Sequence, residues 1–213
     1  FMNSIIQRFE NIKSLINNSN IKIIAVSKTF PVDTIRPLID YGHTHFGENK
    51  VQEAQVKWRE IKKNQPNLKL HMIGKLQSNK AKDAVELFDF IHSVDNQKLA
   101  SLLAKHQNNI NKKLDYFIQV NIGNESQKSG VDIKSLDDFF NYCTRELKLN
   151  IIGLMGIPPQ DRQENSHFNN LLNLNKLLGL KELSMGMSGD FTTAIKYETT
   201  YVRIGSSIFG KRV

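Results

Sequence analysis

Short apolar runs alternate with longer amphipathic segments along nearly the whole chain. The runs are rich in β-branched and aromatic residues, as is typical of buried strands, and they cover residues 21–27, 43–47, 68–73, 90–94, 116–121, 151–156, 182–187 and 201–204. The segments between them have a helical period and cover residues 33–41, 50–63, 79–88, 97–109, 135–147 and 164–178, with a shorter one near 192–196. An amphipathic segment over residues 4–17 precedes the first run.

This order of elements predicts an α/β protein built as a single (β/α)8 barrel of the TIM type, preceded by one N-terminal helix. A doubly wound open sheet is the alternative, although it would more often use roughly five to seven strands. No linker, low-complexity tract or shift in composition divides residues 1–213, so we expect one domain.

The composition fits a globular chain with a basic surface. Its 213 residues are 39% hydrophobic, and 29 Lys and Arg against 21 Asp and Glu give a net charge of +8. A net positive charge of this size can serve to bind nucleic acid or another polyanion. The lysines are spread along the chain, however, and no zinc-finger, RRM or basic-zipper signature accompanies them. We therefore expect solvated helix faces and no nucleic-acid partner, and keep polyanion binding as an alternative that salt would weaken.

Several features favour a cytoplasmic protein without a membrane partner. No stretch approaches the roughly 20 apolar residues that span a bilayer, and the first residues lack the pattern of a secretory signal. The single cysteine, Cys143, excludes an intrachain disulfide and fits a reducing compartment. His43 and His45 alternate on the second strand without a third ligand in sequence range, so we expect no metal site.

Lys28 follows the first strand in the stretch AVSKTFP, residues 25–31. Active sites of (β/α)8 barrels lie at the C-terminal ends of the strands. A lysine there can lose its charge through desolvation or cationic neighbours, and a neutral lysine is a nucleophile for carbonyl groups. For Lys28 taken alone, a solvated loop lysine is the simpler interpretation. The residues at the other strand ends therefore decide whether Lys28 belongs to a functional site.

The last two strands end in the stretches SMGMSGD, residues 184–190, and VRIGSSIFG, residues 202–210. Barrels of this class often bind phosphate with the loops after strands seven and eight. Gly189 and Gly205 would let the backbone approach a phosphate, and Ser188 and Ser206 would add hydroxyl groups. Tight turns without a ligand are the alternative interpretation of these pairs.

Arg203 lies two residues before Gly205, and the strand period of two places both on one face, so Arg203 can point into the barrel. A carbonyl-reactive lysine, a phosphate-binding pair of loops and an interior arginine together predict pyridoxal 5′-phosphate as the cofactor. Lys28 would form a Schiff base with it, and Arg203 would face its pyridine nitrogen. Because a guanidinium only donates hydrogen bonds, that nitrogen would stay unprotonated and the ring would be a weak electron sink.

Eight stretches carry a resemblance to a known family. They are AVSKTFP, FGENKVQE, HMIGKLQSNK, HSVDNQKLA, VNIGNESQKSGV, GLMGIPP, LSMGMSGD and VRIGSSIFG, and they run in this order through nearly the whole chain. Together they resemble the YggS-type pyridoxal-phosphate homeostasis proteins. The resemblance implies a fold type III barrel similar to the N-terminal domain of alanine racemase, without its C-terminal β-domain.

The resemblance also implies roles for individual residues. It matches Lys28 to the Schiff-base lysine, Arg203 to the arginine near the ring nitrogen, and Ser188, Gly205 and Ser206 to phosphate-binding positions. It matches Asn49 and Met155 to residues that line the cofactor pocket. Two departures are small, since Lys75 stands where the family varies and Ser206 where a threonine is common.

The function implied is homeostasis of pyridoxal phosphate, by storage or by delivery to pyridoxal-phosphate-dependent apoenzymes, with no catalytic residue and no efficient turnover. A racemase-like enzyme acting on amino acids is the alternative. In alanine racemase a tyrosine from the separate β-domain supplies a second acid/base. This chain ends nine residues after Ile204, so we expect no such domain and, without its dimerising surface, a monomer.

Overall fold

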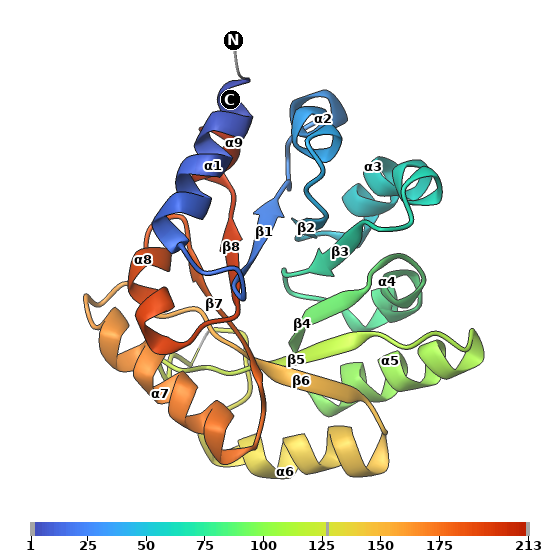
Figure 1. The fold of residues 1–213 in the computed structure, drawn as a ribbon. Helices are drawn as coiled ribbons and strands as arrows, with labels where there is room; N and C mark the ends of the chain where they lie inside the picture. The colour runs from blue at the N-terminus through green and yellow to red at the C-terminus, as the bar shows by residue number, and fades with distance from the viewer. Residues whose placement is uncertain (1–2, 127, 212–213) are drawn as a thin grey trace.

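The computed structural model describes residues 3–126 and 128–211. Eight parallel strands close into a barrel in chain order, and the last strand pairs with the first (Figure 1). The strands are β1 Lys22–Val26, β2 His45–Glu48, β3 Lys69–Met72, β4 Phe90–Val94, β5 Asp115–Gln119, β6 Asn150–Met155, β7 Glu182–Met187 and β8 Tyr201–Ile204. The predicted (β/α)8 barrel is confirmed, and each predicted strand is present with ends that shift by two residues at most.

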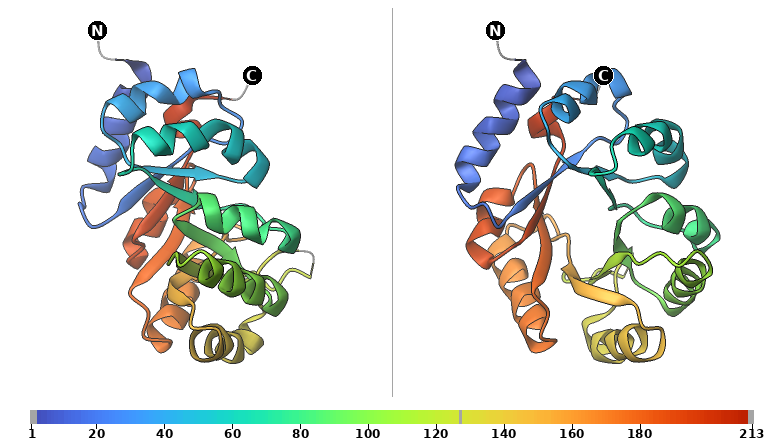
Figure 2. Two further views of the ribbon diagram at one scale, coloured as in Figure 1. Left: turned by 90° about the vertical axis from the view of Figure 1, so that its right-hand side faces the viewer. Right: turned by 45° about the vertical axis from the view of Figure 1, so that its right-hand side comes forward.

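Helices form the outer layer of the barrel (Figure 2). The α-helices are α1 Ser4–Ile16, α2 Val32–Asp40, α3 Val51–Asn64, α4 Ala81–Leu87, α5 Gln97–Asn109, α6 Leu136–Asn141, α7 Glu164–Leu177, α8 Phe191–Ala194 and α9 Ser206–Phe209. Short 3-10 turns lie at Ser78–Lys80, Ile133–Ser135 and Ile195–Tyr197. The two ends of the chain meet where Arg8 Nε donates to the carbonyl of Ile208 at 2.6 Å, which joins α1 to α9.

The alternation of side chains along each strand divides the apolar core in two. Side chains that point outward pack beneath the helices and form the larger cluster, which contains the fully buried Phe46, Trp58 and Phe88. A smaller cluster inside the barrel is made of Ile24, Phe90, Phe117, Met155 and Tyr201. The polar groups at the C-terminal strand ends lie beyond this inner cluster, where they are free to form a site.

One helical prediction differs from the structure, and one short helix was missed. Residues 135–147 do not form one α-helix, because α6 continues as a π-helical turn over Tyr142–Glu146. Thr144 Oγ1 donates to the carbonyl of Phe140 at 2.8 Å there, a side-chain bond that competes with regular helix geometry. The short α9 was not predicted, because its residues belong to the stretch VRIGSSIFG, which was interpreted as a strand end and its loop. None of the described helices has the length and apolar character needed to cross a membrane.

Candidate functional site

A cavity of about 530 Å³ opens at the C-terminal ends of the strands, near the junction of β1 and β8. Ligand pockets usually have volumes of roughly 300–1,000 Å³. Seven of the eight residues predicted to bind a cofactor line this cavity, namely Lys28, Asn49, Ser188, Gly189, Arg203, Gly205 and Ser206. The rest of the lining is Val26, Ile73, Ile157, Met187 and Lys211. The structure therefore brings together residues that lie as far apart in the chain as positions 28 and 206.

A buried ion pair lies directly behind Lys28. The preceding residue, Ser27, donates through Oγ to Glu48 Oε1 at 2.7 Å, and the same oxygen accepts from Lys57 Nζ and Trp58 Nε1, each at 2.8 Å. The Glu48 side chain is fully buried, and that of Lys57 is 7% exposed. This network ties the ends of β1 and β2 to α3, and so fixes the backbone that carries Lys28.

Asn49 directly follows β2 and is held by a close backbone contact. A Cβ atom at Gly74 would lie 2.4 Å from the carbonyl oxygen of Asn49 and 2.7 Å from its Cα. Only glycine permits this approach of the loop after β3 to the loop after β2. Gly74 therefore positions Asn49 at the edge of the cavity without lining the cavity itself.

Arg203 brings a buried positive charge to the floor of the cavity. Its side chain donates through Nη1 to Ser184 Oγ at 2.6 Å and through Nη2 to the carbonyl of Gly156 at 3.1 Å, and the residue is only 4% exposed. Burial lowers the pKa of Arg203 to about 10, against the opposing attraction of Asp190, so the guanidinium is charged at neutral pH. These two bonds use two of its five N–H groups, which leaves donors for a ligand.

One serine joins the loops after β7 and β8. Ser188 Oγ accepts from the backbone N–H of Gly205 at 3.3 Å and from that of Ser207 at 3.4 Å. A Cβ at Gly189 would meet no atom within 4 Å, so this loop leaves open space beside the serine. Hydroxyl and backbone N–H groups gathered in this way are suited to an anion such as phosphate.

Met155 and Lys211 differ from the sequence analysis. Met155 is fully buried inside the barrel and does not line the cavity, so its predicted contact with a ligand is not supported. Ile157, two residues after Met155, lines the cavity. Lys211 was missed because it lies beyond β8 and α9, where no strand-end pattern points to it.

His43 and His45 lie at the N-terminal end of the barrel, opposite the cavity that Lys28 lines. His43 Nε2 is 2.8 Å from the carbonyl of His45, which is a backbone contact rather than a shared ligand geometry. Within residues 3–126 and 128–211, no three histidine, cysteine or acidic side chains gather in a way that could hold a metal ion.

Comparisons with known proteins agree with this arrangement. The family described as alanine racemase, N-terminal domain, matches residues 2–213. The pyridoxal phosphate homeostasis protein of Vibrio cholerae is 38% identical over 230 aligned positions, which cover 99% of this chain and 98% of that protein. The chain belongs to the pyridoxal phosphate homeostasis family. The pyridoxal phosphate homeostasis protein of Escherichia coli K12 is 37% identical, and the aligned region covers 90% of this chain and 86% of that protein.

Solved structures of the same family have the same barrel. PipY of Synechococcus elongatus is 35% identical, and its structure without pyridoxal phosphate matches with a TM-score of 0.91 over 97% of this chain and 100% of PipY. Its structure with pyridoxal phosphate bound matches with a TM-score of 0.89. An alanine racemase of Clostridium difficile, 14% identical with a TM-score of 0.74, shares the fold over 57% of its length. The family resemblance drawn from the eight stretches is confirmed.

Proposed function

We propose that this chain binds pyridoxal 5′-phosphate as a Schiff base on Lys28 and serves the homeostasis of this cofactor, by storing it or delivering it to apoenzymes. The observation that carries the proposal is one cavity that unites Lys28, Arg203 and the loops joined by Ser188. The names of the relatives and the pyridoxal-phosphate-bound structure of PipY support this choice of cofactor.

When bound, pyridoxal phosphate supplies an aldehyde that condenses with an amine and a ring that withdraws electrons. The cavity fits it in size and in charge, since its three charged residues, Lys28, Arg203 and Lys211, are all cationic. Lys28 would bind the aldehyde carbon. The loops after β7 and β8, which Ser188 joins, would bind the phosphate. Arg203 would donate to the ring nitrogen, which keeps that nitrogen unprotonated and the ring a weak electron sink.

The lining supplies few groups for turnover, which favours a carrier. Among the described residues that line the cavity, none is a tyrosine, histidine, cysteine or carboxylate. Racemisation needs an acid/base group on each face of the ring. With Lys28 on one face, a racemase-like enzyme would have to use Lys211 or water on the other.

The first test is the visible absorption of the purified protein after addition of pyridoxal phosphate. We expect wild type to develop the yellow band of a lysine Schiff base and Lys28→Ala to lack it. Lys82→Ala removes an equal charge from an exposed position on α4 and should keep the band. No band in wild type, or an unchanged band in Lys28→Ala, would sink the proposal.

A second test separates the carrier from the enzyme. The loaded protein is mixed with an apoenzyme that needs pyridoxal phosphate, and, in parallel, with single L-amino acids. A carrier restores the apoenzyme and leaves the amino acids unchanged, whereas a racemase-like enzyme accumulates D-amino acids. Size-exclusion chromatography with light scattering tests the predicted monomer.

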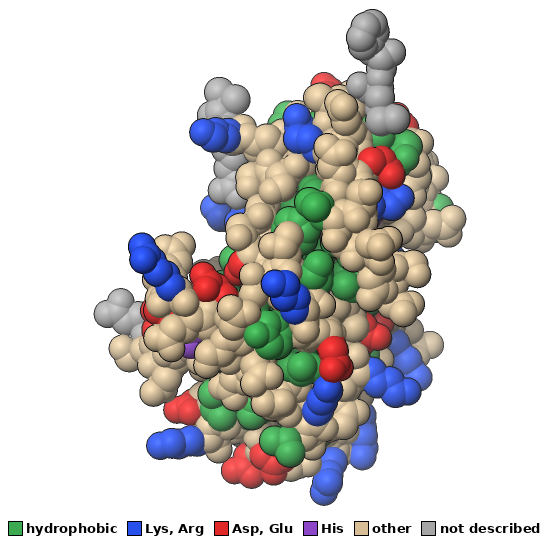
Figure 3. All heavy atoms as spheres, turned by 60° about the vertical axis from the view of Figure 1, so that its left-hand side comes forward, with side chains coloured by type: hydrophobic (Ala, Val, Ile, Leu, Met, Phe, Trp, Pro, Cys, Tyr) green, Lys and Arg blue, Asp and Glu red, His purple; other side chains and the backbone are tan. Residues whose placement is uncertain are grey.

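Polyanion binding has weaker support. On the face shown in Figure 3, Lys and Arg side chains are interspersed with Asp and Glu. Exposed ion pairs such as Lys63–Glu60 and Lys176–Glu198 are consistent with solvated helix faces. A polyanion-binding protein would instead bind DNA with an affinity that falls steeply with salt and does not depend on Lys28.

A further inference from the structure

A chain of hydrogen bonds runs through the barrel interior from Arg203 to the opposite end. Arg203 Nη1 donates to Ser184 Oγ at 2.6 Å, and that oxygen is 2.9 Å from His92 Nδ1. His92 Nε2 is 2.9 Å from His71 Nδ1, and His71 Nε2 is 2.8 Å from His45 Nδ1. Ser184, His71 and His92 are fully buried. We call these five residues the barrel relay.

The direction of every bond in the barrel relay follows from its arginine end. Arg203 can only donate, so Ser184 accepts from it and has its own hydroxyl proton to place. His92 Nδ1 is the acceptor within reach of that proton, and a buried hydroxyl without an acceptor would be costly. Burial lowers the pKa of His45 to about 4 and those of His71 and His92 well below their usual range, so each ring is neutral near pH 7.

A neutral imidazole has one N–H group, and this determines which nitrogen donates and which accepts in every bond of the barrel relay. Since His92 accepts at Nδ1, it donates from Nε2 to His71, and His71 donates from Nε2 to His45. His45 then accepts at Nδ1 and carries its proton on Nε2. No acceptor in the described part of the chain bonds this last N–H.

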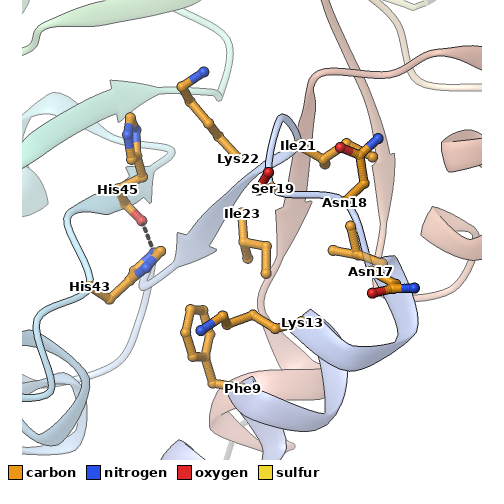
Figure 4. A pocket seen from close by; sticks show the side chains of 11 residues that line it. Phe9, Lys13, Asn17, Asn18, Ser19, Ile21, Lys22, Ile23, His43 and His45 are labelled. Carbon is orange, nitrogen blue, oxygen red and sulfur yellow. Dashed lines mark hydrogen bonds between the residues drawn. The ribbon is translucent and has the colours of Figure 1, made fainter.

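The free N–H of His45 belongs to the wall of a second cavity. This cavity, of about 620 Å³, lies at the N-terminal end of the barrel between α1, β1 and the start of β2 (Figure 4). Lys13, Lys22 and His43 also line it, together with Asn17 and Asn18. No carboxylate lines it, and because Lys13 is paired with Glu10 at 3.0 Å, Lys22 is the lining cation that forms no ion pair among the described residues.

The charges around His45 favour an anion. Lys22 Nζ lies 5.2 Å from the centre of the Tyr201 ring and forms no ion pair within residues 3–126 and 128–211. Lys22 and Lys69 are the charged groups that act most strongly on His45, and both are cations. The nearby Asp89 is already paired with Lys62 at 2.5 Å. Further carboxylates, on Asp115 and Glu182, act on Tyr201 from β5 and β7, the ring that Lys22 also faces.

We propose that the cavity at the N-terminal end of the barrel binds a small oxyanion, a phosphate or carboxylate group held by Lys22 and the Nε2–H of His45, and that the barrel relay couples this site to Arg203. An anion on His45 polarises its ring and makes Nδ1 a stronger acceptor, and each following bond is strengthened in turn. Ser184 then holds the Arg203 guanidinium more firmly. This site lies at the opposite end of the barrel from Lys28 and does not rest on the proposed function.

The test is a titration of the full chain, labelled with ¹⁵N in its histidine rings, with sodium phosphate at constant ionic strength near pH 7.5. Long-range ¹H–¹⁵N spectra report the tautomer of each ring. We expect Nε2–H for His45, His71 and His92 before any addition. Phosphate should shift His45 saturably, with smaller shifts of His71 and His92. An acetate titration distinguishes a phosphate site from a general oxyanion site, and saturation by either anion supports the proposal.

Two variants test whether phosphate binding depends on Lys22. Lys22→Gln removes the exposed cation and should weaken phosphate binding about tenfold, the order expected for a lost hydrogen bond to a charged group. Lys105→Gln removes the same charge from an exposed position on α5 and should change nothing. An Nδ1–H tautomer at His45, no saturation by about 10 mM of either anion, a saturable shift confined to His45, or equal effects of the two variants would each overturn the proposal.

Discussion

Removal of the Glu48 carboxylate should destabilise the protein strongly, because it supports the strand that carries Lys28. In Glu48→Ala, the Nε1–H of Trp58 and the Oγ–H of Ser27 lose a buried acceptor, and Lys57 loses its shorter ion pair. Breaking a buried pair by removal of one partner costs about 3–5 kcal/mol. Lys57 keeps a contact with Glu53 at 3.1 Å, so we expect the lower part of this range, about 3 kcal/mol.

The assay is urea unfolding of wild type and variants, followed by tryptophan fluorescence and circular dichroism. A loss of about 3 kcal/mol should also lower Tm by roughly 6–12 °C for a chain of this size. Glu60→Ala is the matched control, because the Glu60–Lys63 pair is 75% and 65% exposed and should contribute less than about 0.5 kcal/mol. If Glu48→Ala lost less than about 1 kcal/mol, the argument that this network holds the end of β1 would be wrong.

Two further predictions concern the histidines and the glycines. Burial lowers the pKa of His43 and His45 to about 4, so from pH 6.5 downward the unfolded chain binds protons that the folded chain does not. The free energy of unfolding should therefore fall by about 1.4 kcal/mol per pH unit for each such ring. Urea unfolding at pH 7 and pH 5.5 should show this loss, and His43→Gln should show a shallower slope; an unchanged slope would contradict the burial argument. Gly74→Ala should destabilise by about 1–3 kcal/mol and weaken cofactor binding, because its Cβ would collide with Asn49. The new Cβ of Gly189→Ala would lie in open space, so this variant should leave the urea midpoint unchanged. Equal midpoints for the two variants would refute the close contact between Gly74 and Asn49.

The barrel could be predicted from the sequence because its signal is local. Each strand is a short apolar run and each long helix displays its own period, so the alternation survives errors of one or two residues at the ends. The π-helical turn at Tyr142–Glu146 escaped prediction because a change of helix type leaves the apolar pattern almost unaltered, and the four-residue α9 because it lies in a stretch interpreted as a loop.

The cavity at the C-terminal strand ends could be predicted almost as well, because barrel topology gathers these strand ends on one side of the molecule. Met155 lies in the inner apolar cluster rather than in the lining of the cavity, and its contact with a ligand stays a prediction. The network around Glu48 and the barrel relay were missed. They depend on contacts between different elements, such as Glu48 of β2 with Trp58 of α3, or His45 with His71, in which 26 positions separate the partners. For the barrel relay, the signal was present only as polar residues at inward-facing strand positions, whereas Glu48 faces α3 on the outside of the barrel.

The most direct test of the central claim is to locate the lysine that carries the cofactor. Protein saturated with pyridoxal phosphate is reduced with borohydride and digested, and the labelled peptide is identified by mass spectrometry. Lys28 and Lys211 both line the cavity, so the experiment decides between two named amines. We predict that the label lies on Lys28 in one-to-one amount. A label on Lys211, or one scattered over exposed lysines, would contradict the account.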